Sequence, residues 1–160
     1  MPEVYILTGA VHTGKTTAIM QWAEAAKNVF GIITPIVDGR RSFMDVHTGA
    51  TFEMLAAQDE KSVFEVGRFR FSTKAFEHAT DIIANSSRLE RGWLVIDECG
   101  PLELGGKGFS HVIRQALLHC DMKILLVVRE NIIVQVLEYF GLKKDEVSVL
   151  NVQTLQQLAK

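Results

Sequence analysis

The sequence has few of the features that mark secreted or membrane-spanning proteins. Only two of its 160 residues are cysteines, Cys99 and Cys120, and their separation fits neither a metal site nor a redox motif. No apolar run approaches the ~20 residues that cross a bilayer. An acidic residue, Glu3, stands where a signal peptide would carry positive charge. We therefore expect a protein of the reducing cytoplasm without a membrane partner.

The sequence also lacks an excess of charge of one sign. It contains 17 basic and 19 acidic residues, for a net charge of −2. Because a nucleic-acid surface needs clustered Lys and Arg, and the densest basic stretch, residues 68–70, is short and interrupted, we expect no nucleic-acid partner. Repeats and linkers rich in Pro, Gly or Ser are missing as well. The length then favours a single domain, residues 1–160, as a monomer or weak oligomer.

One glycine-punctuated segment, residues 9–16, fits the pattern G-x-x-x-x-G-K-[ST] at every fixed position. An apolar run precedes it and a helical pattern follows, which is the strand–loop–helix setting of a phosphate-binding loop, or P-loop. Its glycines let successive backbone N–H groups point at phosphates. We predict that a nucleoside triphosphate such as ATP or GTP contacts Gly9, Ala10, Val11, His12, Thr13, Gly14, Lys15, Thr16 and Thr17. Lys15 should reach the β- and γ-phosphates, and the Thr16 hydroxyl should coordinate Mg²⁺.

Two acids, Asp97 and Glu98, follow the four apolar residues of a predicted buried strand. We expect Asp97 to bind Mg²⁺ together with Thr16. Adjacent side chains at a strand end point to opposite sides, so Glu98 should have a different role, as the base that accepts a proton from water attacking the γ-phosphate. Glu103, beyond a turn at Gly100-Pro101, is either a nucleotide or loop contact or a helix-start residue.

Apolar runs alternate with segments of helical period along the chain. Strands are predicted at residues 4–7, 32–37, 93–96, 124–128 and 147–149, and helices around residues 19–26, 75–83, 109–120 and 132–140. Continuous apolar strands alternating with helices predict a three-layer α/β fold with a mostly parallel sheet. Residues 40–71 break this rhythm. Their β-like segments, 42–46, 51–55 and 63–71, predict a small antiparallel insertion.

These motifs together resemble the small P-loop nucleoside triphosphatase family of archaea, bacteria and animals, which includes the human cancer-related nucleoside triphosphatase. The family's acidic strand typically ends in D-E-x-G-P-x-E-L, matched here by Asp97, Glu98, Gly100, Pro101, Glu103 and Leu104. The resemblance covers roughly residues 4–149. It implies Mg²⁺-dependent hydrolysis of ATP, GTP and related triphosphates to the diphosphate and phosphate. It also implies the additional-strand type of P-loop fold, in which another strand separates the P-loop strand from the acidic one.

An arginine outside the P-loop commonly stabilises the charge that phosphoryl transfer builds on the γ-phosphate. The candidates are Arg41, Arg68, Arg114 and Arg129. Arg129 follows an apolar strand, and ligands bind at the carboxyl ends of parallel strands, so it is our first choice, with Lys15 and Glu98 as the other catalytic residues. Arg41 and Arg68 lie in the insertion, where they are candidates for a lid over the nucleotide.

Three activities share such a P-loop. A small-molecule or nucleotide kinase needs an acceptor pocket and usually an arginine-rich lid, and the segment after the predicted helix 109–120 offers few arginines. A nucleotide-gated binding module does not need a second acid beside Asp97. The Asp97-Glu98 pair therefore favours a nucleoside triphosphatase, with the kinase and the binding module as alternatives.

Overall fold

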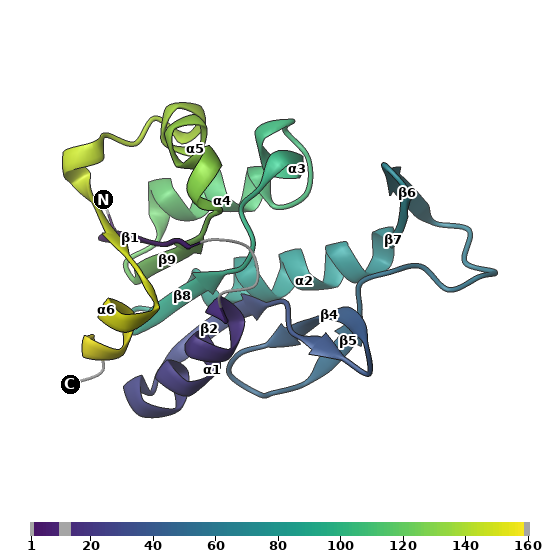
Figure 1. Cartoon of the computed structure of the whole chain (residues 1–160), viewed down its shortest axis with the longest axis horizontal. Coiled ribbons are helices and arrows are strands. Elements are labelled where there is room, and N and C mark those ends of the chain that lie inside the picture. Colours follow the sequence, from purple (N-terminus) through teal and green to yellow (C-terminus); the bar gives the residue numbers. More distant parts are fainter. Residues whose placement is uncertain (1, 10–13, 159–160) are drawn as a thin grey trace.

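The structure of the chain is a computed structural model that describes residues 2–9 and 14–158 (Figure 1). Four predicted nucleotide contacts, Ala10, Val11, His12 and Thr13, lie outside these described residues. Within the described ranges, none of the helices has the length and apolar character that crossing a bilayer requires.

A mostly parallel sheet forms the centre of the molecule, as predicted. Its parallel strands, in spatial order, are β10 (Val147–Leu150), β1 (Val4–Leu7), β9 (Lys123–Val127), β8 (Trp93–Ile96) and β2 (Val29–Ile33). Strand β9 separates β1, which leads into the P-loop, from β8, which leads to Asp97. The additional-strand arrangement is thus confirmed.

Helices cover both faces of this sheet (Figure 1). They are α1 (Lys15–Ala26), α2 (Thr73–Ser86), α3 (Pro101–Leu104), α4 (Ser110–His119), α5 (Ile133–Phe140) and α6 (Val152–Gln157), with short 3₁₀ turns at Glu130–Ile132 and Lys144–Glu146. Successive strand residues face opposite sides, so that Val95 of β8 packs with α1 and α6, and Leu94 packs with α2, α4 and α5. The two cores account for the continuous apolar character of the strands.

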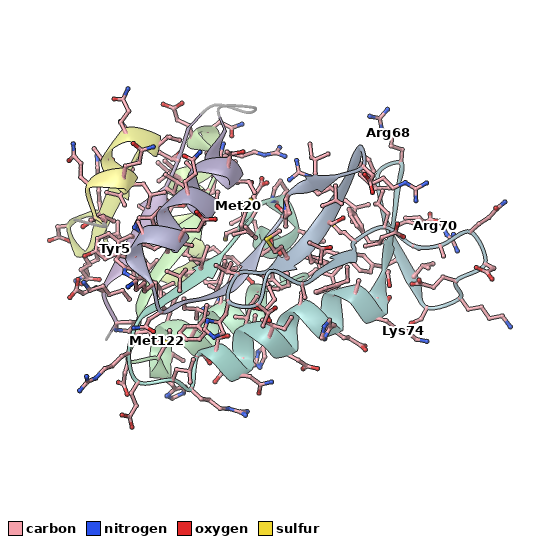
Figure 2. All side chains as sticks on the ribbon, turned by 90° about the horizontal axis from the view of Figure 1, so that it is seen from below. Tyr5, Met20, Arg68, Arg70, Lys74 and Met122 are labelled. Carbon is pink, nitrogen blue, oxygen red and sulfur yellow. The ribbon has the colours of Figure 1, made fainter. Side chains whose placement is uncertain are left out.

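The region predicted as an antiparallel insertion is antiparallel, and part of it extends the main sheet. Strand β4 (Arg40–Asp45) pairs with β2, β3 (Ile36–Val37) and β5 (Thr51–Glu53). Strands β6 (Val63–Val66) and β7 (Phe69–Ser72) form a separate hairpin. This hairpin projects from the end of α2, where Arg68 and Arg70 lie far from Tyr5 (Figure 2).

Two predicted strands are wrong in their extent. Residues 63–71 are not one strand, because Gly67, at φ 60, turns the chain between β6 and β7. Residues 32–37 are not one strand either. The parallel strand begins earlier, at Val29, and ends at Ile33, because the Thr34 amide donates to the Asp97 carboxylate and Pro35 has no N–H to donate. Helix α6 was not predicted.

Gly31 allows β2 and β8 to approach closely. It has φ 112, and a Cβ at this position would collide with the backbone of Val95. Gly49 has a similarly positive φ of 79, but a Cβ there would meet nothing within 4 Å. Gly31 is therefore required both by its φ angle and by its close contact with Val95, whereas Gly49 is required by its φ angle alone.

We expect Gly31→Ala to lower the free energy of unfolding by about 2–6 kcal/mol, the sum of backbone strain and overpacking. Gly49→Ala, the matched control, should cost only about 1–2 kcal/mol. Equilibrium unfolding in urea measures both values. Equal losses in the two variants would show that the contact with Val95 is not what requires a glycine.

Candidate active site

The described part of the P-loop lies at the start of α1. Gly14 is the residue before this helix and has φ 78, a left-handed conformation that favours glycine. The next residues, Lys15 and Thr16, form the first turn of α1. The Lys15 ammonium donates a hydrogen bond to the Gly9 carbonyl oxygen at 3.1 Å. Lys15 thus contacts the segment that follows β1.

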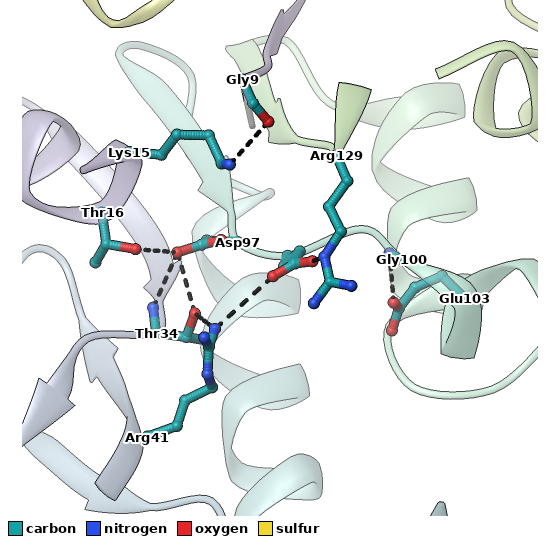
Figure 3. Close-up of polar contacts among 10 residues, drawn as sticks. Gly9, Lys15, Thr16, Thr34, Arg41, Asp97, Gly100, Glu103 and Arg129 are labelled. Carbon is teal, nitrogen blue, oxygen red and sulfur yellow. Dashed lines mark hydrogen bonds and ion pairs between the residues drawn. The ribbon is translucent and has the colours of Figure 1, made fainter. Parts of the chain in front are cut away.

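The Asp97 carboxylate joins three segments of the chain (Figure 3). Its Oδ2 accepts hydrogen bonds from the Thr16 hydroxyl at 3.2 Å and from the amide and hydroxyl of Thr34, both at 3.1 Å. Only 2% of Asp97 is exposed. Burial raises the pKa of its carboxyl above the ordinary value, although the hydrogen bonds from Thr34 and Thr16 act in the opposite direction. The predicted pairing of Asp97 with Thr16 is present.

Thr34 also belongs to the site, although no sequence motif predicts it. It lies directly after β2, at the same edge of the sheet as Asp97, and is itself 5% exposed. Its hydroxyl also accepts a hydrogen bond from Arg41 Nη1 at 3.4 Å. The sequence feature that could have indicated Thr34 is its position at the carboxyl end of a parallel strand, where ligands bind. No motif distinguishes this threonine from one that merely ends a strand.

Glu98 has different partners from Asp97. Its Oε1 lies 2.8 Å from Arg129 Nε, and its Oε2 lies 3.8 Å from Arg41 Nη1 (Figure 3). The Glu98 side chain is 23% exposed, against 45% for Arg129 and 44% for Arg41. A carboxylate accessible to water is therefore held between two guanidinium groups, each of which is itself reachable from solvent.

The four candidate arginines occupy different places. Arg129 and Arg41 lie at the site, one after β9 and the other in β4. Arg68 lies instead over the Phe69 ring, 5.3 Å from its centroid, and Arg114 lies over Tyr139 at 5.0 Å. Neither Arg68 nor Arg114 lines the cavity, described in the next paragraph, that Glu98 shares with Lys15 and Thr16. Of the two insertion arginines, only Arg41 is placed to cover a ligand there.

A cavity of about 440 Å³ brings the predicted residues together. Its lining includes Gly14, Lys15, Thr16, Thr17, Asp97, Glu98 and Arg129. Its volume is within the range of small-molecule sites, roughly 300–1,000 Å³. The first turn of α1 lines this cavity, and the start of a helix offers an anion backbone N–H groups and the positive end of the helix dipole. Such a cavity fits an anionic ligand with several phosphate oxygens.

Two oxygen donors in this cavity suit Mg²⁺. Thr16 offers a hydroxyl and Asp97 a carboxylate, both hard ligands of the kind that Mg²⁺ prefers. Among residues 2–9 and 14–158, no group of three or more His, Cys, Asp or Glu side chains is placed to hold a metal by itself. Magnesium at a P-loop takes its remaining ligands from phosphate oxygens and water, so the two protein donors are sufficient.

Glu103 connects the two ends of the segment that links β8 to α4. Its Oε1 accepts from the Gly100 amide and its Oε2 from the Phe109 amide, each at 2.9 Å. The residue is 4% exposed, and burial raises the pKa of its carboxyl. The hydrogen bond from Gly100 agrees with the interpretation of Glu103 as a helix-start residue.

Solved structures with a similar fold include the crystal structure of THEP1 from Aquifex aeolicus, with a TM-score of 0.71 at 17% identity over 98% of this chain and 99% of that chain. The solution structure of a human cancer-related nucleoside triphosphatase also has a TM-score of 0.71, at 23% identity over 99% of this chain and 95% of that chain. At these identities the likeness shows the fold.

Sequence comparison gives relatives named nucleoside-triphosphatase THEP1. The protein from Methanopyrus kandleri is 30% identical over 125 residues, 72% of this chain and 68% of the relative. The protein from Thermotoga sp. is 27% identical over 113 residues, 69% of this chain and 65% of the relative, so the match spans just under two thirds of the Thermotoga protein. The NTPase family matches residues 4–157, and the chain therefore belongs to this family.

Proposed function

We propose that the chain hydrolyses nucleoside triphosphates, including ATP and GTP, to the diphosphate and phosphate in a Mg²⁺-dependent reaction. The observation that carries this proposal is the position of Glu98, which lines the same cavity as Lys15, Thr16 and Asp97 and has its own basic partner in Arg129. Membership of the NTPase family and the names of the two relatives support it. The resemblance of residues 9–16 and 97–104 to the motifs of the small P-loop nucleoside triphosphatases supports it as well.

Binding of the triphosphate rests on the P-loop and α1. Backbone N–H groups at the start of α1 meet phosphate oxygens, and the helix dipole favours their negative charge. Lys15 replaces its contact with the Gly9 carbonyl by contacts with the β- and γ-phosphates. Thr16 and Asp97 would hold Mg²⁺, which would neutralise charge on the phosphate oxygens.

Hydrolysis then depends on Glu98 and an arginine. The Glu98 carboxylate accepts a proton from the attacking water while the bond between the γ-phosphorus and the bridging oxygen breaks. The charge that develops on the γ-phosphate oxygens is stabilised by a guanidinium group. Arg129 is our assignment for this group because its Nε lies only 2.8 Å from Glu98, so it is already beside the reacting atoms.

The pairing of Glu98 argues against a module that only binds nucleotide. A metal-bound triphosphate needs Lys15, Thr16 and Asp97, and none of these requires a carboxylate held between two arginines.

The two cysteines, Cys99 and Cys120, are buried and free. They are compatible with the reducing cytoplasm, which we propose as the location of the protein.

Replacing the proposed base tests the hydrolytic mechanism directly. We expect Glu98→Gln to lower kcat by about 10²–10⁴-fold, the usual contribution of a general base, while ATP still binds. Lys15→Ala should weaken ATP binding as well as turnover. Phosphate release at saturating ATP and Mg²⁺ measures kcat, and calorimetric titration with ATP measures binding. The exposed Glu138→Gln is the matched control and should behave as wild type. Wild-type turnover in Glu98→Gln would exclude this base.

The choice of arginine has its own test. We expect Arg129→Ala to lower kcat by about 10³-fold or more, because a guanidinium that stabilises the transferred phosphoryl group contributes that much. Arg114→Ala, which removes an arginine that stacks on Tyr139, is the control and should change kcat less than about twofold. Single-turnover phosphate release separates the chemical step from product release. A normal rate in Arg129→Ala together with a large loss in Arg41→Ala would transfer the role to Arg41.

A further inference from the structure

A second cavity, of about 530 Å³, adjoins the one that contains the P-loop residues. The two cavities share Thr34, Arg41, Asp97, Glu98 and Arg129. Lys15, Thr16 and Thr17 line only the first cavity. Glu98 and its two arginines therefore stand at the junction, with the P-loop on one side and a second space on the other.

The walls of this second space are aromatic. Rings reach it from the insertion, from α2 and from the start of α4, and they belong to Phe43, Phe69, Phe71, Phe76 and Phe109. Phe76 links several of them, since its ring centroid lies 5.0 Å from Phe43, 5.6 Å from Phe71 and 5.5 Å from Phe109. A ring-bearing molecule has favourable offset-stacked and edge contacts with such a surface.

The outer wall of the cavity comes from the β6–β7 hairpin. Phe69 is 47% exposed and Val66 is 42% exposed, yet both line this cavity. Arg68 between them extends along the Phe69 ring. Apolar side chains exposed on the wall of a cavity indicate a ligand-binding surface more strongly than scattered surface residues do.

The position of the cavity relative to Glu98 indicates what such a ligand would do. A triphosphate held by Lys15 and Thr16 shares its cavity with Glu98 and Arg129, so the γ-phosphate is the part of the nucleotide that these two residues would meet. Phosphoryl transfer requires the attacking oxygen opposite the leaving oxygen. A molecule in the aromatic cavity approaches Glu98 from the side without P-loop residues, which is the side from which attack must come.

We propose that the aromatic cavity binds a phosphoryl acceptor, an alcohol that carries a flat aromatic ring. This inference rests on the proposed function, because it replaces the attacking water by the acceptor's hydroxyl group. The hydroxyl gives its proton to the Glu98 carboxylate, and its oxygen forms a bond to the γ-phosphorus. The bond from that phosphorus to the β–γ bridging oxygen breaks, and its electron pair stays on the nucleoside diphosphate. The products are the diphosphate and a phosphate monoester, and water competes with the alcohol for the same phosphoryl group.

The test follows the fate of the transferred group. The wild-type chain is incubated with Mg²⁺ and ATP radiolabelled on its γ-phosphate, alone and with each of five probes at millimolar concentration: adenosine, guanosine, cytidine, uridine and 2-phenylethanol. Chromatography separates free phosphate from phosphorylated probe. We expect label in at least one probe, so that the diphosphate formed exceeds the free phosphate. Equal amounts of diphosphate and phosphate with all five probes would overturn the proposal.

Variants of the hairpin tie the transfer to the cavity. Phe69→Ala removes a half-exposed ring from its wall, and we expect the ratio of phosphorylated probe to free phosphate to fall about fivefold, the worth of one aromatic contact. Val66→Asp, which places a charge on the same wall, should lower the ratio too. Leu118→Ala removes an apolar side chain from α4 that is more exposed than either and lies outside the cavity, and it should leave the ratio unchanged. An unchanged ratio in both hairpin variants would place the acceptor elsewhere and overturn the assignment.

The same reactions separate this proposal from hydrolysis itself. Phosphate release in the absence of any probe, with no label in any probe, leaves hydrolysis standing and removes the acceptor site. Label in a probe, with no phosphate release in its absence, supports the acceptor site and removes hydrolysis as the activity. Absence of diphosphate in every reaction would overturn both.

Discussion

The site depends on one buried carboxylate oxygen that accepts three hydrogen bonds. Asp97 Oδ2 receives them from the first turn of α1, through Thr16, and from the end of β2, through Thr34. A buried carboxylate that lost these donors would be costly, because burial penalises its charged form. The same oxygen therefore fixes the spacing between the P-loop helix and two strands of the sheet. It also explains why β2 ends where it does, since the Thr34 amide is committed to Asp97 rather than to the neighbouring strand.

The additional strand β9 determines which residues can meet at this carboxylate. Neighbouring strands lie about 4.8 Å apart, so β8 is about 10 Å from β1 across the sheet. Thr16 spans that gap because α1 leaves the end of β1 and crosses toward β2, which lies beyond β8. The carboxyl end of β9 falls between the two, and Arg129 follows it. The strand that separates the P-loop from the acidic strand thus places an arginine between them.

Motifs and apolar periodicity were sufficient to predict the mostly parallel sheet, the strand and helix on either side of residues 10–13, and the places of Asp97, Glu98 and Arg129. They failed where a partner distant in sequence decides the structure. Thr34 belongs to the site because β2 pairs with β8 and so ends beside Asp97, and nothing local to Thr34 shows this pairing. Arg41 was a candidate from the sequence, but its place beside Glu98 depends on the pairing of β4 with β2. The split of residues 32–37 had a local signal in Pro35, which is rarely found within a central strand. The turn between β6 and β7 also had a local signal, in Gly67. The residues on both sides of Gly67 have a β-like pattern, however, and together they were predicted as one strand.

Glu98 shows why the site is open to two kinds of nucleophile. Its carboxylate is reached from the P-loop cavity and from the aromatic cavity, and two arginines hold it at their junction. A base that serves only water needs a small, polar space beyond the γ-phosphate. Five phenylalanine rings, including the half-exposed Phe69, and the exposed Val66 line the space beyond Glu98 instead. An aromatic ring that packs against these side chains removes apolar surface from water, with a gain in free energy. When the cavity holds no acceptor, the phosphoryl group goes to water. When it holds an alcohol, the alcohol's hydroxyl replaces water as the nucleophile, and the residues that bind the triphosphate stay the same.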